Sequence, residues 1–158
     1  APKGDRALAT AVEKAFGLIL PKGPGSSAHE ATAALWIGPS RWLLAADDPA
    51  FAGRVTAALV GDGARLLDLT HARTVVTIAG AAARDVLAAG CPLDLHPDAF
   101  PDGATATSHF GPITMTVHRR GDGFDLYVLS SYARHFWEML TDAALPFGGE
   151  VDGSAPAP

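Results

Sequence analysis

The stretch from Gly80 to Gly103 most constrains how this chain can fold. Its first half is rich in helix-forming residues, and Gly90 stands where a left-handed C-cap would end the helix. Its second half carries three prolines, which restrict the backbone, and the apolar residues Leu93, Leu95 and Phe100, which need cover. Strand-like sequence lies on both sides. We therefore expect a fixed, partly buried crossing that joins the two halves of the chain.

The Gly111-Pro112 pair predicts a two-residue hairpin loop between strands at 104–110 and 113–119. Such a loop fixes the register and gives the hairpin one apolar face and one polar face. The polar face lacks the lysine and glutamate that usually keep an exposed sheet soluble. We therefore expect this face to contact another protein. Its residues are Thr105, Thr107, His109, Thr114, Thr116 and His118.

The remaining patterns predict an α+β domain in which helices cover a mainly antiparallel sheet, in the order ββα-ββα-βββα. Beside the hairpin and the central helix at 81–89, the expected elements are a helix at 5–16, strands at 33–37 and 42–46, a helix from Asp48 to near Gly61, strands at 65–69, 74–79 and 124–129, and a last helix to about Ala144 that Ser130 or Ser131 caps.

The run of proline and glycine between residues 20 and 27 is typical of a linker. We therefore expect residues 1–30 to form an arm and linker that also takes part in contacts with another protein. Residues 31–151 are predicted to form a single domain. Residues 152–158 are predicted to be a disordered tail.

Charge and composition narrow the classes of function. The net charge of −5 and the lack of a basic cluster larger than Arg119-Arg120 argue against nucleic-acid binding. No apolar run approaches the ~18 residues of a membrane span. A single cysteine and no secretory signal fit a reducing cytoplasm. Only 18% of residues are charged, which either reflects the high alanine content or indicates a subunit interface.

Motifs that carry chemistry are scarce. The sequence holds neither a glycine-rich dinucleotide pattern nor a phosphate-binding loop. His109 and His118 share a hairpin face, but about 13 Å separates them at ~3.3 Å per residue, which is too far for one metal ion. Cys91 has His96 nearby in sequence, yet the local charges are aspartates, which do not favour a reactive thiolate. We expect a buried structural thiol.

The densest polar cluster is Asp68, His71 and Arg73, at a predicted turn between two strands. One interpretation is a ligand site in which the cation and the imidazole hold an acidic substrate. The other is a structural turn, in which Asp68 accepts backbone hydrogen bonds and Arg73 neutralises its charge. We favour the structural turn.

Several segments together resemble the gamma-subunit family of the heterotetrameric sarcosine oxidases. The matching segments are residues 34–44, 68–74, 90–97 and 99–101, then 124–128, 130–132 and Trp137. The resemblance implies a fold similar to the folate-binding domain of the glycine-cleavage aminomethyltransferase and of the tRNA-modifying GTPase. It also implies membership of a complex with alpha, beta and delta subunits, on which FAD, FMN, NAD, zinc and tetrahydrofolate would be bound. No catalytic residue, cofactor or metal is implied for this chain.

The leading hypothesis is therefore a non-catalytic structural subunit of a cytoplasmic, flavin-dependent sarcosine oxidase. Such a complex converts sarcosine to glycine, with formaldehyde or 5,10-methylenetetrahydrofolate and hydrogen peroxide as the other products. One alternative is the gamma subunit of a related N-methyl amino-acid oxidase. Another is a stand-alone protein that binds folate or transfers one-carbon units, with Asp68 or Asp94 holding the pterin ring. A hydrolase that uses Cys91 is the least favoured.

Overall fold

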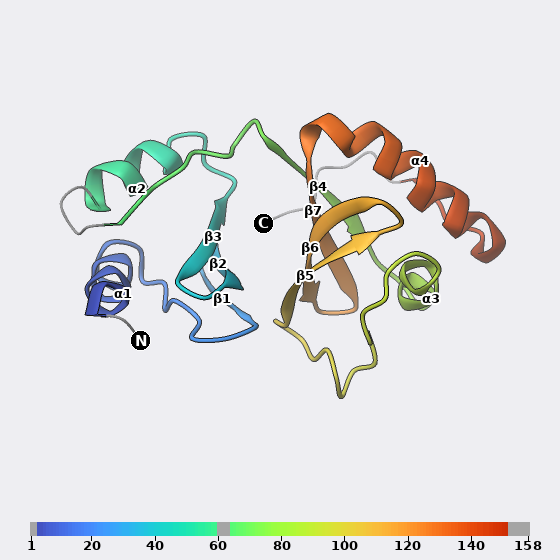
Figure 1. Ribbon diagram of the computed structural model, residues 1–158, viewed down its shortest axis with the longest axis horizontal. Helices are drawn as coiled ribbons and strands as arrows, with labels where there is room; N and C mark the ends of the chain where they lie inside the picture. The colour runs from blue at the N-terminus through green and yellow to red at the C-terminus, as the bar shows by residue number, and fades with distance from the viewer. Residues whose placement is uncertain (1–2, 60–63, 152–158) are drawn as a thin grey trace. The chain divides into compact units, whose positions relative to one another are not determined.

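The computed structural model describes residues 3–59 and 64–151, and these form two compact units that meet in sequence at Thr70 and His71 (Figure 1). This division differs from the expected arm at 1–30 and single domain at 31–151. The predicted tail at 152–158 lies outside the described residues. We describe each unit by itself.

The first unit packs two helices on a three-stranded antiparallel sheet. Its elements are α1 (Lys3–Phe16), β1 (Ser26–His29), β2 (Thr32–Gly38), β3 (Arg41–Ala46) and α2 (Phe51–Leu59), with strand order β1-β2-β3. Asp48 holds the turn that precedes α2, because its Oδ1 accepts the Ala50 N–H at 2.8 Å, but the helix begins at Phe51 and not at Pro49 as predicted. The predicted end of this helix near Gly61 lies outside the described residues.

The N-terminal residues are part of this unit's core and do not form a separate arm. Val12 of α1 and Leu18 and Leu20 after it are buried with Phe51 and Val55 of α2. The predicted linker also contains β1, whose residues pair with β2. The prediction was wrong because the proline and glycine residues indicate a turn or a linker. β1 forms because its backbone pairs with β2, and local composition does not reveal that pairing.

The second unit packs two helices on a four-stranded antiparallel sheet. Its elements are β4 (Arg73–Ile78), α3 (Ala83–Ala88), β5 (Thr105–Phe110), β6 (Ile113–Arg120), β7 (Gly123–Leu129), the 3₁₀ turn η1 (Ser130–Tyr132), α4 (Ala133–Ala144) and the 3₁₀ turn η2 (Leu145–Phe147). The strand order is β4-β7-β6-β5, so β4 and β5 are the two edges.

The predicted hairpin register is confirmed. Phe110 lies opposite Ile113, and the pairing continues to Thr105 opposite His118. On the apolar face the sheet packs against α3, α4 and the crossing, where Leu95 and Phe100 are buried as expected. The α+β class with antiparallel sheets covered by helices is therefore correct.

The predicted order of elements was wrong in two places, because β1 is an additional strand and the strand expected at 65–69 is missing. Residues 64–69 form neither a strand nor a helix, so the observed order is α-βββ-α followed by β-α-βββ-α. The crossing also does not join the two units, because it lies wholly within the second one.

Two predicted helix ends were wrong as well. Gly90 is not among the residues with positive φ; instead, a Cβ added there would lie 2.9 Å from the Phe110 ring, so glycine is required by close packing. Neither serine caps α4, because η1 precedes it and Tyr132 occupies its N-cap. Ser130 instead donates its backbone N–H to the Ala72 carbonyl.

Candidate functional site

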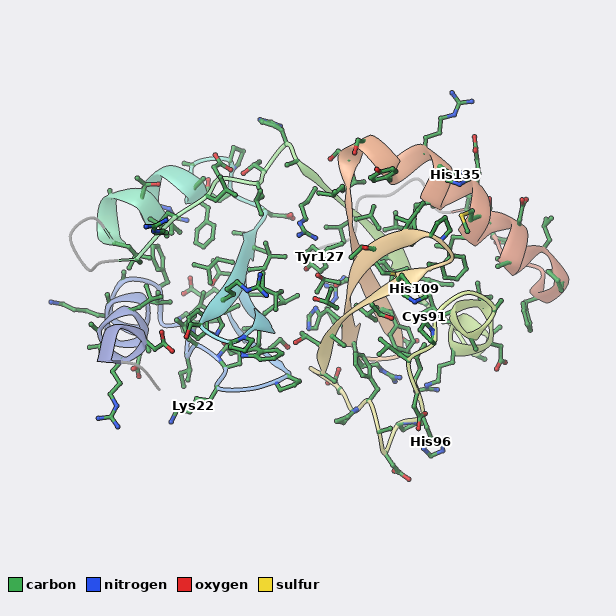
Figure 2. The ribbon with its side chains drawn as sticks, in the orientation of Figure 1. Lys22, Cys91, His96, His109, Tyr127 and His135 are labelled. Atoms are coloured by element: carbon green, nitrogen blue, oxygen red, sulfur yellow. The ribbon has the colours of Figure 1, made fainter. Side chains whose placement is uncertain are left out.

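A polar cluster lies on the face of the second unit's sheet opposite α3 and α4. Pairing across β6 and β7 sets His118 opposite Asp125, and pairing across β4 and β7 sets Thr77 opposite the same residue. Asp125 is only 5% exposed and His118 only 7%. Tyr127, labelled in Figure 2, lies two residues further along β7 and is also buried.

Asp125 is the centre of this cluster. Its Oδ1 accepts the Thr77 hydroxyl hydrogen at 2.7 Å, and its Oδ2 accepts the Arg120 Nε–H at 2.9 Å. The Arg120 Nη2 lies 3.3 Å from Oδ1, so the guanidinium contacts both oxygens of the carboxylate. A buried carboxylate needs such partners because desolvation penalises an unpaired charge. These contacts therefore hold three strands together.

His118 lies beside the pair formed by Asp125 and Arg120. Its Nδ1 is 3.8 Å from Asp125 Oδ2. Burial lowers the pKa of His118 and Arg120 lowers it further, while Asp125 and Asp102 oppose them by raising it. The contact is therefore between a neutral imidazole and a carboxylate at neutral pH. Burial, together with Asp125, also raises the pKa of Tyr127 to about 12, so its phenol stays neutral.

The lowered pKa of His118 predicts a loss of stability in acid. The unfolded chain binds a proton below about pH 6.5, the ordinary pKa of histidine, while folded His118 resists it. The contribution of neutral His118 to the free energy of unfolding is therefore complete above about pH 6.5. It is lost as the pH falls toward the lowered pKa of His118 in the folded chain. Chemical denaturation between about pH 7 and pH 5 should show the decline.

The variant His118→Gln should reduce this decline, whereas His135→Gln, at a side chain that is 60% exposed, should keep it. An unchanged slope in His118→Gln would contradict the assignment.

The six residues of the predicted interface are not equally accessible. Thr105, Thr116 and His118 are buried within the chain. Thr107, His109 and Thr114, near the loop of the hairpin, are exposed. The predicted register places these six residues on one face of the hairpin, as observed, but it could not show which of them are buried within the chain. Only the exposed three could contact a partner from this face.

The predicted cluster of Asp68, His71 and Arg73 is divided between the two units. Asp68 Oδ1 accepts both the backbone N–H and the hydroxyl hydrogen of Thr70, at 2.9 and 2.6 Å. This contact is the backbone-bonded turn of the structural interpretation. His71 is exposed, and Arg73 is the first residue of β4, opposite Leu129.

Cys91 lies in the core of the second unit. Its Sγ is 3.7 Å from the Ser108 hydroxyl oxygen. Figure 2 places His96 apart from it, and His96 is exposed, with Nδ1 3.6 Å from Asp98 Oδ2. The histidine near in sequence is therefore not positioned as a base for the thiol.

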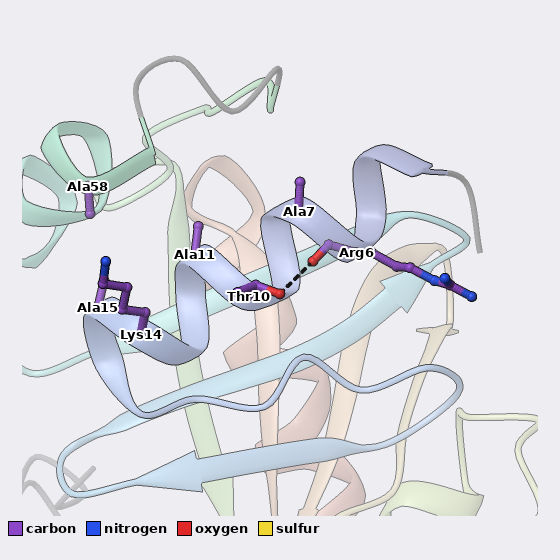
Figure 3. Close-up of a pocket in the computed structure, with 7 residues that line it drawn as sticks. All are labelled: Arg6, Ala7, Thr10, Ala11, Lys14, Ala15 and Ala58. Carbon is purple, nitrogen blue, oxygen red and sulfur yellow. Dashed lines mark hydrogen bonds between the residues drawn. The ribbon is translucent and has the colours of Figure 1, made fainter.

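An open hollow lies between α1 and α2 in the first unit (Figure 3). Its lining, in the described part of the chain, is Arg6, Ala7, Thr10, Ala11, Lys14, Ala15 and Ala58. Two of these lining residues, Arg6 and Lys14, are cationic and the others have small side chains. The described lining contains no carboxylate or imidazole for acid–base chemistry. Across the described residues, no group of three His, Cys, Asp or Glu could hold a metal ion. No described helix is long and apolar enough to cross a membrane.

Comparison with known proteins finds similarity across almost the whole chain. Residues 2–145 match the family described as "Sarcosine oxidase, gamma subunit family". This chain belongs to the sarcosine oxidase gamma subunit family. The match extends from α1 to the end of α4, so both units of the structure are part of the family's fold.

Relatives and a solved structure support this membership. The sarcosine oxidase subunit gamma of Corynebacterium sp. (strain P-1) is 35% identical over 145 residues, which are 89% of this chain and 71% of the relative. That of Arthrobacter sp is 35% identical over 142 residues, which are 87% and 70%. A chain of the heterotetrameric sarcosine oxidase from Corynebacterium sp. U-96, in complex with pyrrole 2-carboxylate, has a TM-score of 0.82 and 33% identity, covering 96% of this chain and 80% of that one.

Sequence reasoning about this gamma-subunit family member missed the cluster around Asp125. A usable signal was present, because Gly121 and Asp122 form a second two-residue loop. Extending the pairing of Arg120 with Gly123 by two residues sets His118 opposite Asp125. Thr77 could not be found in this way, because β4 and β7 are far apart in sequence and no short loop fixes their register.

Proposed function

We propose that this chain is the non-catalytic gamma subunit of a heterotetrameric sarcosine oxidase. The complex would oxidise sarcosine to glycine, with formaldehyde or 5,10-methylenetetrahydrofolate and hydrogen peroxide as the other products. One observation carries this proposal: the similarity extends over residues 2–145, and a chain of a solved oxidase complex superimposes on 96% of this one. Because the similarity extends over the chain and is not confined to one motif, it supports the same subunit role for this chain as for its relatives.

The polar groups support a structural role and not a catalytic one. Asp125, the buried carboxylate of the cluster, accepts hydrogen bonds from Thr77 and Arg120 on both of its oxygens. A general base needs an available lone pair directed at a substrate proton. The contacts of Asp125 instead join neighbouring strands, so the cluster would stabilise the sheet.

The described residues do not fit a dinucleotide or flavin site of the glycine-rich type. Both sheets are antiparallel, whereas such sites lie at the carboxyl ends of parallel strands. The turn from β4 to α3 has Gly80 as its one glycine. We therefore propose that FAD, FMN, NAD, zinc and tetrahydrofolate bind to the alpha, beta and delta subunits.

Co-expression with the other oxidase subunits tests the proposal. A tagged copy of this chain should bring down the flavin-containing subunits in stoichiometric amounts. The separated chain should contain no flavin and no zinc by absorbance and metal analysis. Failure of the folded chain to bind those subunits, or a stoichiometric flavin on the separated chain, would contradict it.

A stand-alone folate-binding protein is the second candidate, because it would use the same fold. It requires a carboxylate that is available to a pterin ring. Asp68 accepts hydrogen bonds from Thr70, and Asp94 Oδ1 accepts the His96 backbone N–H at 2.9 Å, so each candidate carboxylate already holds its own turn. Tight binding of tetrahydrofolate by the isolated chain would favour this alternative. Assays of the complex with sarcosine and other N-methyl amino acids would test the related-oxidase alternative.

A further inference from the structure

The sulfur-containing side chains of this protein differ in their access to solvent. The sequence holds two methionines, Met115 and Met139, and one cysteine, Cys91. Met115 is 0% exposed and Cys91 is 5% exposed, both in the core of the second unit. Met139, on α4, is half-buried and packs against that core. Because oxidation of a sulfur by a dissolved oxidant requires access, Met139 is the sulfur that such an oxidant reaches first.

Met139 packs against the loop of the β5–β6 hairpin. Gly111 of this loop has a φ of 53°, and a Cβ added there would overlap the Met139 methyl carbon, Cε. The same Cβ would lie 3.7 Å from Met139 Sδ, so the thioether lies against the backbone of Gly111. Phe136 of the same helix contacts the ring of Phe110, the residue before Gly111. The side chains of α4 therefore hold the end of the hairpin in place.

The two residues of the loop, both in the described part of the chain, have no N–H donor left for a polar group at Met139. The Gly111 N–H donates to the Gly90 carbonyl at 2.9 Å, and Pro112 has no N–H. A sulfoxide is polar, and a polar oxygen that is buried without a donor costs free energy. An oxidised Met139 therefore does not fit its contact with the loop.

We propose that Met139 is a peroxide-sensitive site, whose oxidation to the sulfoxide releases the loop of the β5–β6 hairpin from α4. A lone pair of the thioether sulfur attacks one oxygen of hydrogen peroxide, and the O–O bond breaks. The sulfur is oxidised by two electrons and keeps the oxygen. The proton of the transferred hydroxyl passes to the leaving hydroxide, which departs as water. The inference rests on the proposed function for its oxidant, because hydrogen peroxide would be a product of the oxidase.

Treatment of the folded chain with added hydrogen peroxide tests the order of oxidation. Mass spectrometry of proteolytic peptides should show the gain of an oxygen at Met139 at least about 10-fold faster than at Met115 or Cys91. In denaturant the two methionines should react at similar rates, because burial alone separates them. Oxidation of either buried sulfur before Met139 in the folded chain would overturn the proposal.

The Gly111 amide reports the release of the loop. Its hydrogen bond to Gly90 protects it from exchange, and its exchange rate should rise by about 10-fold or more after oxidation. Methionine sulfoxide reductases should restore the protection. The amides of β6, a central strand of the sheet, should stay protected and show that the unit has not unfolded. Full conversion of Met139 with unchanged exchange at Gly111 would overturn the proposal.

Two substitutions of Met139 separate oxidation of this sulfur from general damage. Met139→Leu keeps an apolar side chain of similar volume, so peroxide should leave its Gly111 exchange rate within about twofold of the untreated value. Met139→Gln puts a polar group against the loop and should raise this rate without peroxide, toward that of the oxidised wild type. A response of Met139→Leu to peroxide equal to that of the wild type would overturn the proposal.

The source of the peroxide is tested separately in the assembled oxidase. Turnover of sarcosine should oxidise Met139, and added catalase should suppress this oxidation. Turnover without it, in a complex whose Met139 reacts with added peroxide, would overturn the oxidase as the source. A complex that forms no peroxide from sarcosine would instead contradict the proposed function, and the experiments with added peroxide do not depend on that result.

Discussion

Replacement of Asp125 by alanine should lower the free energy of unfolding of the second unit by about 2–4 kcal/mol. The substitution removes the acceptor of the Thr77 hydroxyl and leaves the Arg120 guanidinium without its bidentate partner. We place the loss below that of a fully buried ion pair, because the Arg120 side chain is 41% exposed and water can replace part of the contact.

Asp125→Asn is the matched variant, because it keeps the shape and one acceptor oxygen. It should cost less than alanine, and Thr77→Val should cost about 1 kcal/mol, the usual value for one hydrogen bond. Native-state hydrogen exchange of β7 amides reports the second unit by itself, which matters because a chain of two units need not unfold in one step. A loss below about 0.5 kcal/mol in Asp125→Ala would show that the cluster does not stabilise the sheet.

Phe136→Ala should have an effect of similar or larger size, about 3–5 kcal/mol. The Phe136 side chain is 0% exposed, and its ring lies edge-on to Phe110 with centroids 5.9 Å apart. Its removal leaves a cavity between α4 and the sheet. Gly90 also lies close to the Phe110 ring, since an added Cβ would be 2.9 Å from it, so close packing limits how far the ring can shift into that space.

Asp142→Ala, on an exposed position of the same helix, is the control for this prediction. It should change the free energy of unfolding by less than about 0.5 kcal/mol. Equal losses in the two variants would contradict the prediction, because they would show that the burial of Phe136 does not stabilise the second unit more than an exposed position does.

Local patterns predicted the elements whose geometry is set within a few residues. The Gly111-Pro112 loop fixed the β5–β6 register, and Asp48 marked the turn that precedes α2. The apolar stripe of α1 predicted a helix, but its place in a core could not be predicted. That place depends on Phe51 and Val55 of α2, which are far from it in sequence.

Residues 64–69 show the limit of pattern reading most clearly. A short leucine-rich run predicts that a segment is able to form a strand, but a strand also needs a neighbour with free backbone groups. The Asp125 cluster illustrates the same limit for sites. Its members come from β4, β6 and β7, and only the His118–Asp125 pair is within reach of a hairpin argument. Family resemblance supplied the function, which no single residue indicates.

The strand order β4-β7-β6-β5 has a consequence for the time course of synthesis. β4 is made first among these strands, but its one neighbour in the sheet, β7, is made last. The hairpins of the first unit can close as soon as they leave the ribosome, whereas Arg73 has no partner until Leu129 emerges. During that interval the β-branched run of β4 remains an open edge. A translational pause between residues 78 and 129 should therefore increase aggregation more than a pause after residue 129.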